Sequence, residues 1–314
     1  MHNHTHSQSG DATRQTLSRL ALSLGLTLAF VAVEAFAGVA ANSLALLTDA
    51  AHNLTDVIAL GLSWYAVRLA TRPSNARKTY GYHRAGILVA LVNAATLGII
   101  SLGIFYEAWQ RFQSPPEVQS GILIGVGLVA FAVNLCTALL VKKGSEHDLN
   151  LRSAFVHLTG DVLSTVGAVI AGVIIYFTGA NWLDALVSVL IGLLILWNAW
   201  GILRETVDIL LEATPRDVDM SAMIADMAQI KGVLGVHDLH VWSISSSLRT
   251  MSAHILTDDI AISSGAAIQA AINELVSRRY NISHATLQLE CLGCAPDALY
   301  CDMNGAGYLR ADDK

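Results

Sequence analysis

Charged residues are scarce in this chain of 314 residues: Asp, Glu, Lys and Arg make up 14% of it, against 54% apolar residues. This ratio is far from that of a soluble globular protein and is typical of a membrane protein. Basic residues are also outnumbered, since 19 Lys and Arg stand against 25 Asp and Glu, for a net charge of −6. Without a basic surplus or an arginine-rich aromatic stretch, the sequence does not support nucleic-acid binding.

Cysteine is rare as well, with four in the chain. Cys136 lies in an apolar run, whereas Cys291, Cys294 and Cys301 lie near the C-terminus. An even count alone does not predict a disulfide framework in a chain of this type. Cys291-x-x-Cys294 with Cys301 is only weak evidence for a thiolate metal site, because no second Cys-x-x-Cys pair accompanies it.

The N-terminal region lacks the pattern of a cleavable secretory signal, which has a short apolar core followed by small residues. The apolar run that starts at Leu20 is long and uninterrupted, so it predicts a membrane anchor. Residues 1–16 precede it as a polar tail that contains His2, His4 and His6. These three histidines either belong to a disordered tail with adventitious metal affinity or help to capture metal.

Six long apolar runs are present and predict six transmembrane helices. The expected spans are residues 17–39, 44–69, 85–109, 120–141, 151–177 and 182–203. The short connections 40–43 and 178–181 contain no Lys or Arg. Basic residues flank the opposite ends of the helices, namely Arg14, Arg19, Arg68, Arg72, Arg77, Lys78, Arg84, Lys142, Lys143, Arg152 and Arg204. The positive-inside rule therefore predicts that both termini lie in the cytoplasm.

After Arg204 the pattern becomes that of a soluble domain. It predicts a helix at 218–230, two antiparallel strands at 233–245 and 248–257, a helix at 263–279 and a strand at 284–290. This α-β-β-α-β order predicts a small open sheet with helices on one face, similar to metallochaperone domains. The expected fold is a membrane α-helical bundle over residues 17–207, a cytoplasmic α+β domain over 208–292 and a tail over 293–314.

Two pairs of ionisable residues interrupt the apolar runs. His52 and Asp56 are four residues apart in the second predicted span, and His157 and Asp161 repeat the spacing in the fifth. Residues four apart share one face of a helix, and a charge inside the membrane costs at least ~2.5–3.5 kcal/mol unless it is compensated. If the two helices converge, two imidazoles and two carboxylates surround one point, which suits Zn²⁺.

Other acidic residues in the spans have simpler expected roles. A buried hydrogen bond or a helix-packing contact is the expected role of Glu34, Glu107 and Asp184, each taken alone. Asp49 lies three residues before His52, so we expect it to hydrogen-bond to the His52 ring rather than to bind metal directly.

Four motifs occur in a characteristic order: SLALLTDAAH at 43–52, YGYHRA at 80–85, HLTGD at 157–161 and VHDLHVW at 236–242. On these motifs, which extend over nearly the whole chain, the protein resembles the cation diffusion facilitator family of zinc transporters, especially its bacterial members and animal vesicular relatives. The resemblance implies a homodimer in which residues 208–292 serve dimerisation and metal sensing. It also implies Zn²⁺/H⁺ antiport by alternating access, with His52, Asp56, His157 and Asp161 as the transport ligands.

The chain departs from the family pattern in two places. Gly86 stands where the family usually has Glu, and the loop at 142–150 lacks the long His-rich insertion of many animal members. The short loops and compact length favour a bacterial inner membrane. Because metal ligands must be deprotonated to bind, and an unperturbed His titrates near pH 6.5, we expect His52 and His157 to carry the exchanged protons.

The cytoplasmic histidines suggest a second metal site. His237 and His240 lie three apart in one predicted strand, so we expect them to point to opposite faces. The family pattern implies His237, His254 and Glu290 as a regulatory Zn²⁺ site, with His284 as a further candidate and His83 as a candidate ligand between the domains. Ordinary surface hydrogen bonds are the alternative for all of them.

Two other functions remain open on the sequence alone. One is an intramembrane zinc-dependent hydrolase, although four ligands rather than three are available and no His-Glu-x-x-His motif is present. The other is a membrane-bound metal sensor that relies on the cytoplasmic site. Loss of His157 would abolish flux through a transporter and leave the signal of a sensor unchanged.

Overall fold

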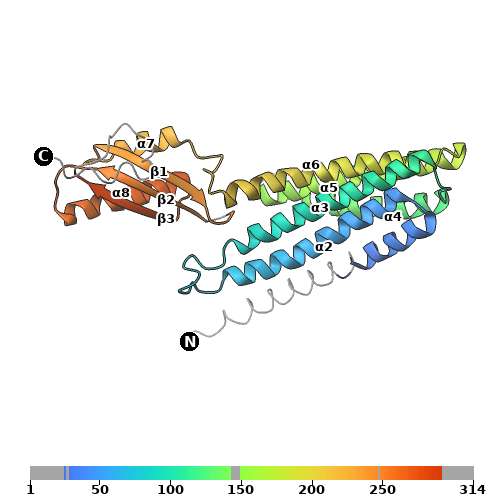
Figure 1. Ribbon diagram of the computed structural model, residues 1–314, viewed down its shortest axis with the longest axis horizontal. Coiled ribbons are helices and arrows are strands. Elements are labelled where there is room, and N and C mark those ends of the chain that lie inside the picture. Colours follow the sequence, from blue (N-terminus) through green and yellow to red (C-terminus); the bar gives the residue numbers. More distant parts are fainter. Residues whose placement is uncertain (1–24, 26–27, 143–148, 247, 292–314) are drawn as a thin grey trace, which may run out of the picture. The chain divides into compact units, whose positions relative to one another are not determined.

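The structure is a computed structural model, which describes residues 25, 28–142, 149–246 and 248–291 (Figure 1). The chain divides into two compact units, Met1–Trp64 with Ala90–Leu203, and Tyr65–Val89 with Arg204–Lys314. The helices of the membrane region are Leu28–Ala41, α2 Leu44–Ala70, α3 Ala85–Gln113, α4 Ser120–Lys142, α5 Leu149–Thr178 and α6 Trp182–Leu210. Helix α6 thus continues beyond residue 207, where we expected the membrane domain to end.

Four of these helices are long and apolar enough to cross a membrane: Ala85–Gln113, Ser120–Leu140, Phe155–Thr178 and Trp182–Leu210. They correspond to the last four predicted spans. The described part of the first predicted span is the shorter helix Leu28–Ala41. Helix α2 has 27 residues, but polar residues interrupt its apolar surface. The count of six spans therefore stays a prediction.

Small residues set the close approach of α4 and α5. A Cβ atom on Gly127 would lie 2.8 Å from Val169 Cγ2, and one on Gly172 would lie 2.9 Å from Ile124 Cγ1. Glycine at these points lets side chains of one helix pack against the backbone of the other. Large apolar side chains such as Trp197, 79% exposed, lie on the outside of the helices, where a bilayer would cover them.

Helix α2 begins at a buried carboxylate. Asp184, in the first turn of α6, is 1% exposed and accepts hydrogen bonds from Ser43 Oγ (2.5 Å), Leu44 N (2.6 Å) and Ala45 N (3.3 Å). Arg111 Nη1 lies 3.7 Å from its Oδ2. The first backbone N–H groups of a helix have no partner within the helix, so Asp184 satisfies them. The expected role of Asp184, a buried hydrogen bond, is found.

The second unit contains α7 Met220–Ala228, β1 Gly235–Ser243, β2 Arg249–Leu256, α8 Ile262–Tyr280 and β3 His284–Glu290. The expected α-β-β-α-β order is confirmed. The sheet order is β1-β2-β3, with β1 antiparallel and β3 parallel to β2. The parallel pair requires a long crossover, which α8 supplies. Side chains from the strands, such as Leu239 and Met251, form one buried core with Met223 of α7 and Ile272 of α8.

The expectation that His237 and His240 point to opposite faces of the sheet is wrong. The register of β1 against β2 shifts between them, so His237 pairs with His254 and His240 pairs with Ser252. Positions 252 and 254 share one face of β2 because side chains alternate along a strand. Asp238, with φ of 49°, lies in this irregularity. Because β1 has one extra residue at this point, His237 and His240 lie on the same face of the sheet, the face away from the helices.

Candidate metal centres

The two His-x-x-x-Asp pairs come together in the membrane unit. Helix α2 carries His52 and Asp56, and α5 carries His157 and Asp161. His52 Nε2 lies 3.6 Å from Asp56 Oδ2 and 3.5 Å from Asp161 Oδ1. His157 Nε2 lies 3.1 Å from Asp56 Oδ2 and 3.7 Å from Asp161 Oδ2. Each imidazole therefore faces one carboxylate of its own helix and one of the other helix.

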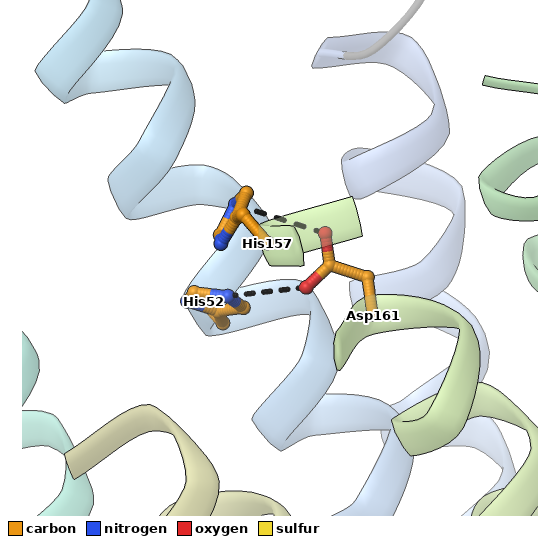
Figure 2. Close-up of side chains that lie close together, drawn as sticks. All are labelled: His52, His157 and Asp161. Atoms are coloured by element: carbon orange, nitrogen blue, oxygen red, sulfur yellow. Dashed lines mark ion pairs between the residues drawn. The ribbon is translucent and has the colours of Figure 1, made fainter. Parts of the chain in front are cut away.

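Figure 2 shows Asp161 reaching toward both His52 and His157, whose rings lie 5.5 Å apart between centroids. Ligand atoms of these three residues all lie within 4.8 Å of one another. Asp56 is outside that tighter group, although its Oδ2 approaches both histidines. Two nitrogens and two carboxylates arranged in this way can hold a divalent cation of zinc type.

The four side chains of this centre are buried to different degrees. The side chains of His52 and Asp161 are 7% and 11% exposed, whereas those of His157 and Asp56 are 40% and 32% exposed. Each helix therefore contributes one buried and one more exposed side chain to this centre.

Asp49 does not have its expected partner. The Nδ1 atom of His52 has no hydrogen-bond partner within the described part of the chain. Asp49 instead accepts from Ser164 Oγ (3.1 Å) and from Asn53 Nδ2 (3.4 Å), and Asn53 Nδ2 also donates to Glu34 Oε2 (3.3 Å). The expectation failed because α5 and the helix Leu28–Ala41 present competing polar groups to Asp49.

The α+β domain contains a second cluster, formed by His237, His254 and Glu290. His237 Nε2 lies 3.2 Å from Glu290 Oε2, and His254 Nδ1 lies 3.0 Å from Glu290 Oε1. Ligand atoms of all three lie within 4.8 Å of one another. His237 is 1% exposed, and its Nδ1 has no hydrogen-bond partner among the described residues, whereas its Nε2 faces Glu290. That contact is an ion pair only when the imidazole is protonated, and a bound cation would instead use the neutral imidazole and the carboxylate as ligands.

The structure also adds a residue that the sequence did not single out. Asp238 Oδ2 lies 3.6 Å from His254 Nε2, and its Oδ1 lies 3.2 Å from His240 Nε2. A carboxylate on the second nitrogen of a metal-binding His fixes its orientation. In the sequence, Asp238 was marked only by its position between two histidines. That position does not predict a contact with His254 unless the irregular register of β1 is known.

The remaining candidates are placed elsewhere. His284 pairs with Thr250 at the opposite end of β3 from Glu290. His83 and His284 line the same cavity, and the His284 ring lies 6.2 Å from the Tyr80 ring. Among the described residues, neither belongs to a group of three metal-binding side chains. The candidates His2, His4, His6, Cys294 and Cys301 lie outside the described residues.

Glu107 does not have the expected buried hydrogen bond or helix-packing contact. Arg111 Nε donates to its Oε1 at 3.0 Å, one turn away on α3, and the Glu107 side chain is 46% exposed. It therefore pairs at the surface of the helix bundle and does not enter the metal centre.

Comparison with known proteins identifies two domains in the chain. The model of the cation efflux transmembrane domain matches residues 20–211, and that of the cation efflux protein cytoplasmic domain matches residues 215–291. The chain is 36% identical over 306 residues to the zinc transporter ZitB of Escherichia coli, covering 96% of each protein. It is 37% identical over 274 residues to the cadmium, cobalt and zinc/H⁺-K⁺ antiporter of Bacillus subtilis, covering 86% of this chain and 88% of that protein.

A further relative is the cation efflux system protein CzcD of an Alcaligenes species, which is 34% identical over 291 residues, covering 93% of this chain and 90% of that protein. The two domain matches lie in sequence and together extend over most of the chain. The membrane unit with its paired histidines and aspartates and the α+β domain with its own cluster correspond to these two domains, and the protein is an integral membrane member of the cation efflux family, the cation diffusion facilitators.

Proposed function

We propose that this protein exports Zn²⁺ from the cytoplasm in exchange for protons, with Cd²⁺ and Co²⁺ as further candidate substrates. The observation that supports this most directly is the convergence of His52, Asp56, His157 and Asp161 from α2 and α5. Relatives are named as a zinc transporter and as a cadmium, cobalt and zinc/H⁺-K⁺ antiporter. The mixed nitrogen and oxygen ligands suit Zn²⁺ better than Mg²⁺ or Ca²⁺, which prefer oxygen ligands alone.

Charge balance explains how protons can replace the cation. Two carboxylates and two neutral imidazoles neutralise one divalent cation. When the cation leaves, protonation of both imidazoles restores the same balance, because each Nε2 lies 3.1–3.7 Å from two carboxylate oxygens. Metal ligands must lose their protons to bind. The same four side chains thus hold either one Zn²⁺ or two protons, and alternating access to the two sides of the membrane would couple their movement.

The cytoplasmic domain would regulate this exchange in a homodimer. His237, His254 and Glu290 would bind a regulatory Zn²⁺, with Asp238 holding His254 in place. Support comes from the burial of His237, whose Nδ1 has no hydrogen-bond partner among the described residues, and from the three converging side chains. The basic residues at one set of helix ends would place both termini in the cytoplasm, and the bacterial relatives favour the inner membrane.

The deciding experiment is Zn²⁺ flux into proteoliposomes under an imposed pH gradient, with the unaltered chain compared with Asp161→Asn. This change keeps the shape of the side chain and removes its charge, so we expect flux to fall to background. Glu107→Gln removes a carboxylate outside the centre and should transport at the unaltered rate. Flux that does not respond to collapse of the pH gradient would contradict the exchange of Zn²⁺ for protons.

A sensor that does not transport is the second candidate, favoured by the separate cytoplasmic cluster. His157→Ala distinguishes the two, because a transporter loses flux whereas a sensor keeps its metal response. Membership of a family of cation transporters argues against the hydrolase alternative.

A further inference from the structure

Glu34 is a buried carboxyl group that takes no direct part in the metal centre. It lies on the helix Leu28–Ala41, is 0% exposed, and its Oε1 has no hydrogen-bond partner within the described residues. Residues 28–67 contain no Lys or Arg, and neither do residues 153–203. An ionised carboxylate buried at membrane depth without a cation is unfavourable, so Glu34 needs another form of compensation.

That compensation is available from Asp49, which is 4% exposed. The Asn53 amide nitrogen lies 3.3 Å from Glu34 Oε2 and 3.4 Å from Asp49 Oδ2, so the two buried carboxyl groups approach one donor. Two carboxylates this close together at membrane depth cannot both be ionised at low cost. One proton on the pair would remove one negative charge and supply a second donor.

This pair lies beside the candidate metal centre. Asp49 precedes His52 by about one helical turn on α2. Ser164 Oγ lies 3.1 Å from Asp49 Oδ1 and 2.8 Å from the backbone oxygen of Asp161. Where the two imidazoles are not both protonated beforehand, a divalent cation raises the net charge of the centre. It would then repel a proton held at Glu34, and loss of that proton would in turn favour the cation.

We propose that the Glu34 carboxyl, which meets Asp49 at the Asn53 amide, is a proton-binding site separate from the metal ligands, and that it releases its proton when a cation enters the metal centre. On release, the carboxyl O–H bond breaks, water takes the proton, and Glu34 and Asp49 are both ionised. When the cation leaves, the O–H bond forms again with a proton from water. The site rests on the proposed exchange of Zn²⁺ for protons and adds up to one proton to those displaced from His52 and His157.

The test counts protons released per Zn²⁺ bound by the full-length protein in detergent. Calorimetric titrations with Zn²⁺ in buffers of different ionisation enthalpy give this number. Glu34→Gln keeps an amide that can donate to Asp49, so it preserves the helix contact while removing the exchangeable proton. We expect it to release up to one proton fewer per Zn²⁺ than the unaltered protein. The cytoplasmic cluster contributes equally to both, and the matched variant Glu107→Gln should release the unaltered number.

The possible results separate this site from the exchange itself. Equal proton release by the unaltered protein and Glu34→Gln would overturn the Glu34 site and leave metal–proton exchange standing. No proton release by the unaltered protein would overturn both. If Glu34→Gln does not fold, infrared difference spectra of the unaltered protein decide the matter. Zn²⁺ should then remove a protonated-carboxyl band that Asp49→Asn shifts, and a spectrum without this loss would contradict the proposal.

Discussion

Replacing Asp184 by Asn should weaken the start of α2 far more than its small chemical change suggests. Asp184 is 1% exposed and accepts from Ser43 Oγ, Leu44 N and Ala45 N, with Arg111 Nη1 3.7 Å away. Asparagine keeps the shape but has one acceptor oxygen, and its amide N–H groups would face donors. The substitution therefore removes a buried charge and leaves backbone donors of α2 unsatisfied.

The expected loss of stability is about 3 kcal/mol. Hydrogen bonds to a charged acceptor contribute roughly 1 kcal/mol more than neutral ones, and an unsatisfied buried donor costs about 1–3 kcal/mol. Breaking a buried ion pair costs about 3–5 kcal/mol. The lower end applies, because Arg111 keeps its contacts with Glu107 and with the backbone oxygen of Asn42.

The assay is thermal unfolding of the full-length protein in detergent, followed by tryptophan fluorescence. A loss of about 3 kcal/mol corresponds to a fall in Tm on the order of 6–12 °C. The control is Glu107→Gln, which removes the other carboxylate partner of Arg111. The Glu107 side chain is 46% exposed, and such pairs contribute about 0.2–1 kcal/mol. If Asp184→Asn melted within about 2 °C of Glu107→Gln, the Asp184 contacts would not stabilise α2 as argued.

Two further predictions concern the packing of α4 against α5 and the α+β domain. Gly172→Ala should destabilise the protein by about 1–3 kcal/mol in the same unfolding assay, because the added Cβ would lie 2.9 Å from Ile124 Cγ1. The control is Gly98→Ala, where an added Cβ meets nothing within 4 Å, and this variant should be neutral or stabilising. Tyr280→Phe should cost about 1–2 kcal/mol at pH 7, since the Tyr280 hydroxyl donates to Asp226. Burial and then that hydrogen bond raise the pKa of Tyr280 from 10.0 to about 12. Because the pKa of Tyr280 is higher in the folded than in the unfolded protein, this stabilisation is complete below pH 10 and is lost as pH rises from 10 to 12. The prediction is contradicted if the difference in stability between the unaltered protein and the Tyr280→Phe variant stays constant over that range.

Much of the fold could be predicted because it depends on local patterns. Long apolar runs identified the four helices that are long and apolar enough to cross a membrane, and alternation of apolar residues identified the α-β-β-α-β order. The meeting of His52, Asp56, His157 and Asp161 could also be inferred, since the i, i+4 spacing fixes one face of each helix. Charges in an apolar run then need partners, and the two pairs are partners of suitable charge.

The failures involve partners that are distant in sequence or an irregular backbone. Ser164 is 115 residues from Asp49 and competes with the expected His52 contact, and no local pattern reveals which helix packs beside α2. Likewise, Asp184 lies 141 residues from Ser43. The error over His237 and His240 arose differently: strict alternation assumes a regular strand, and the extra residue at Asp238 reverses the outcome for every position on one side of it.

The distant contacts of α2 share one physical reason. At membrane depth no water replaces a broken hydrogen bond, so polar groups on a helix need partners on its neighbours. Helix α2 has such partners on three other helices: Asp184 on α6 at its start, Glu34 on Leu28–Ala41, and Ser164 on α5. These contacts fix the rotation of α2 about its axis, and that rotation decides whether His52 faces Asp161 or lipid. These polar contacts therefore help to bring the four side chains of the candidate metal centre together.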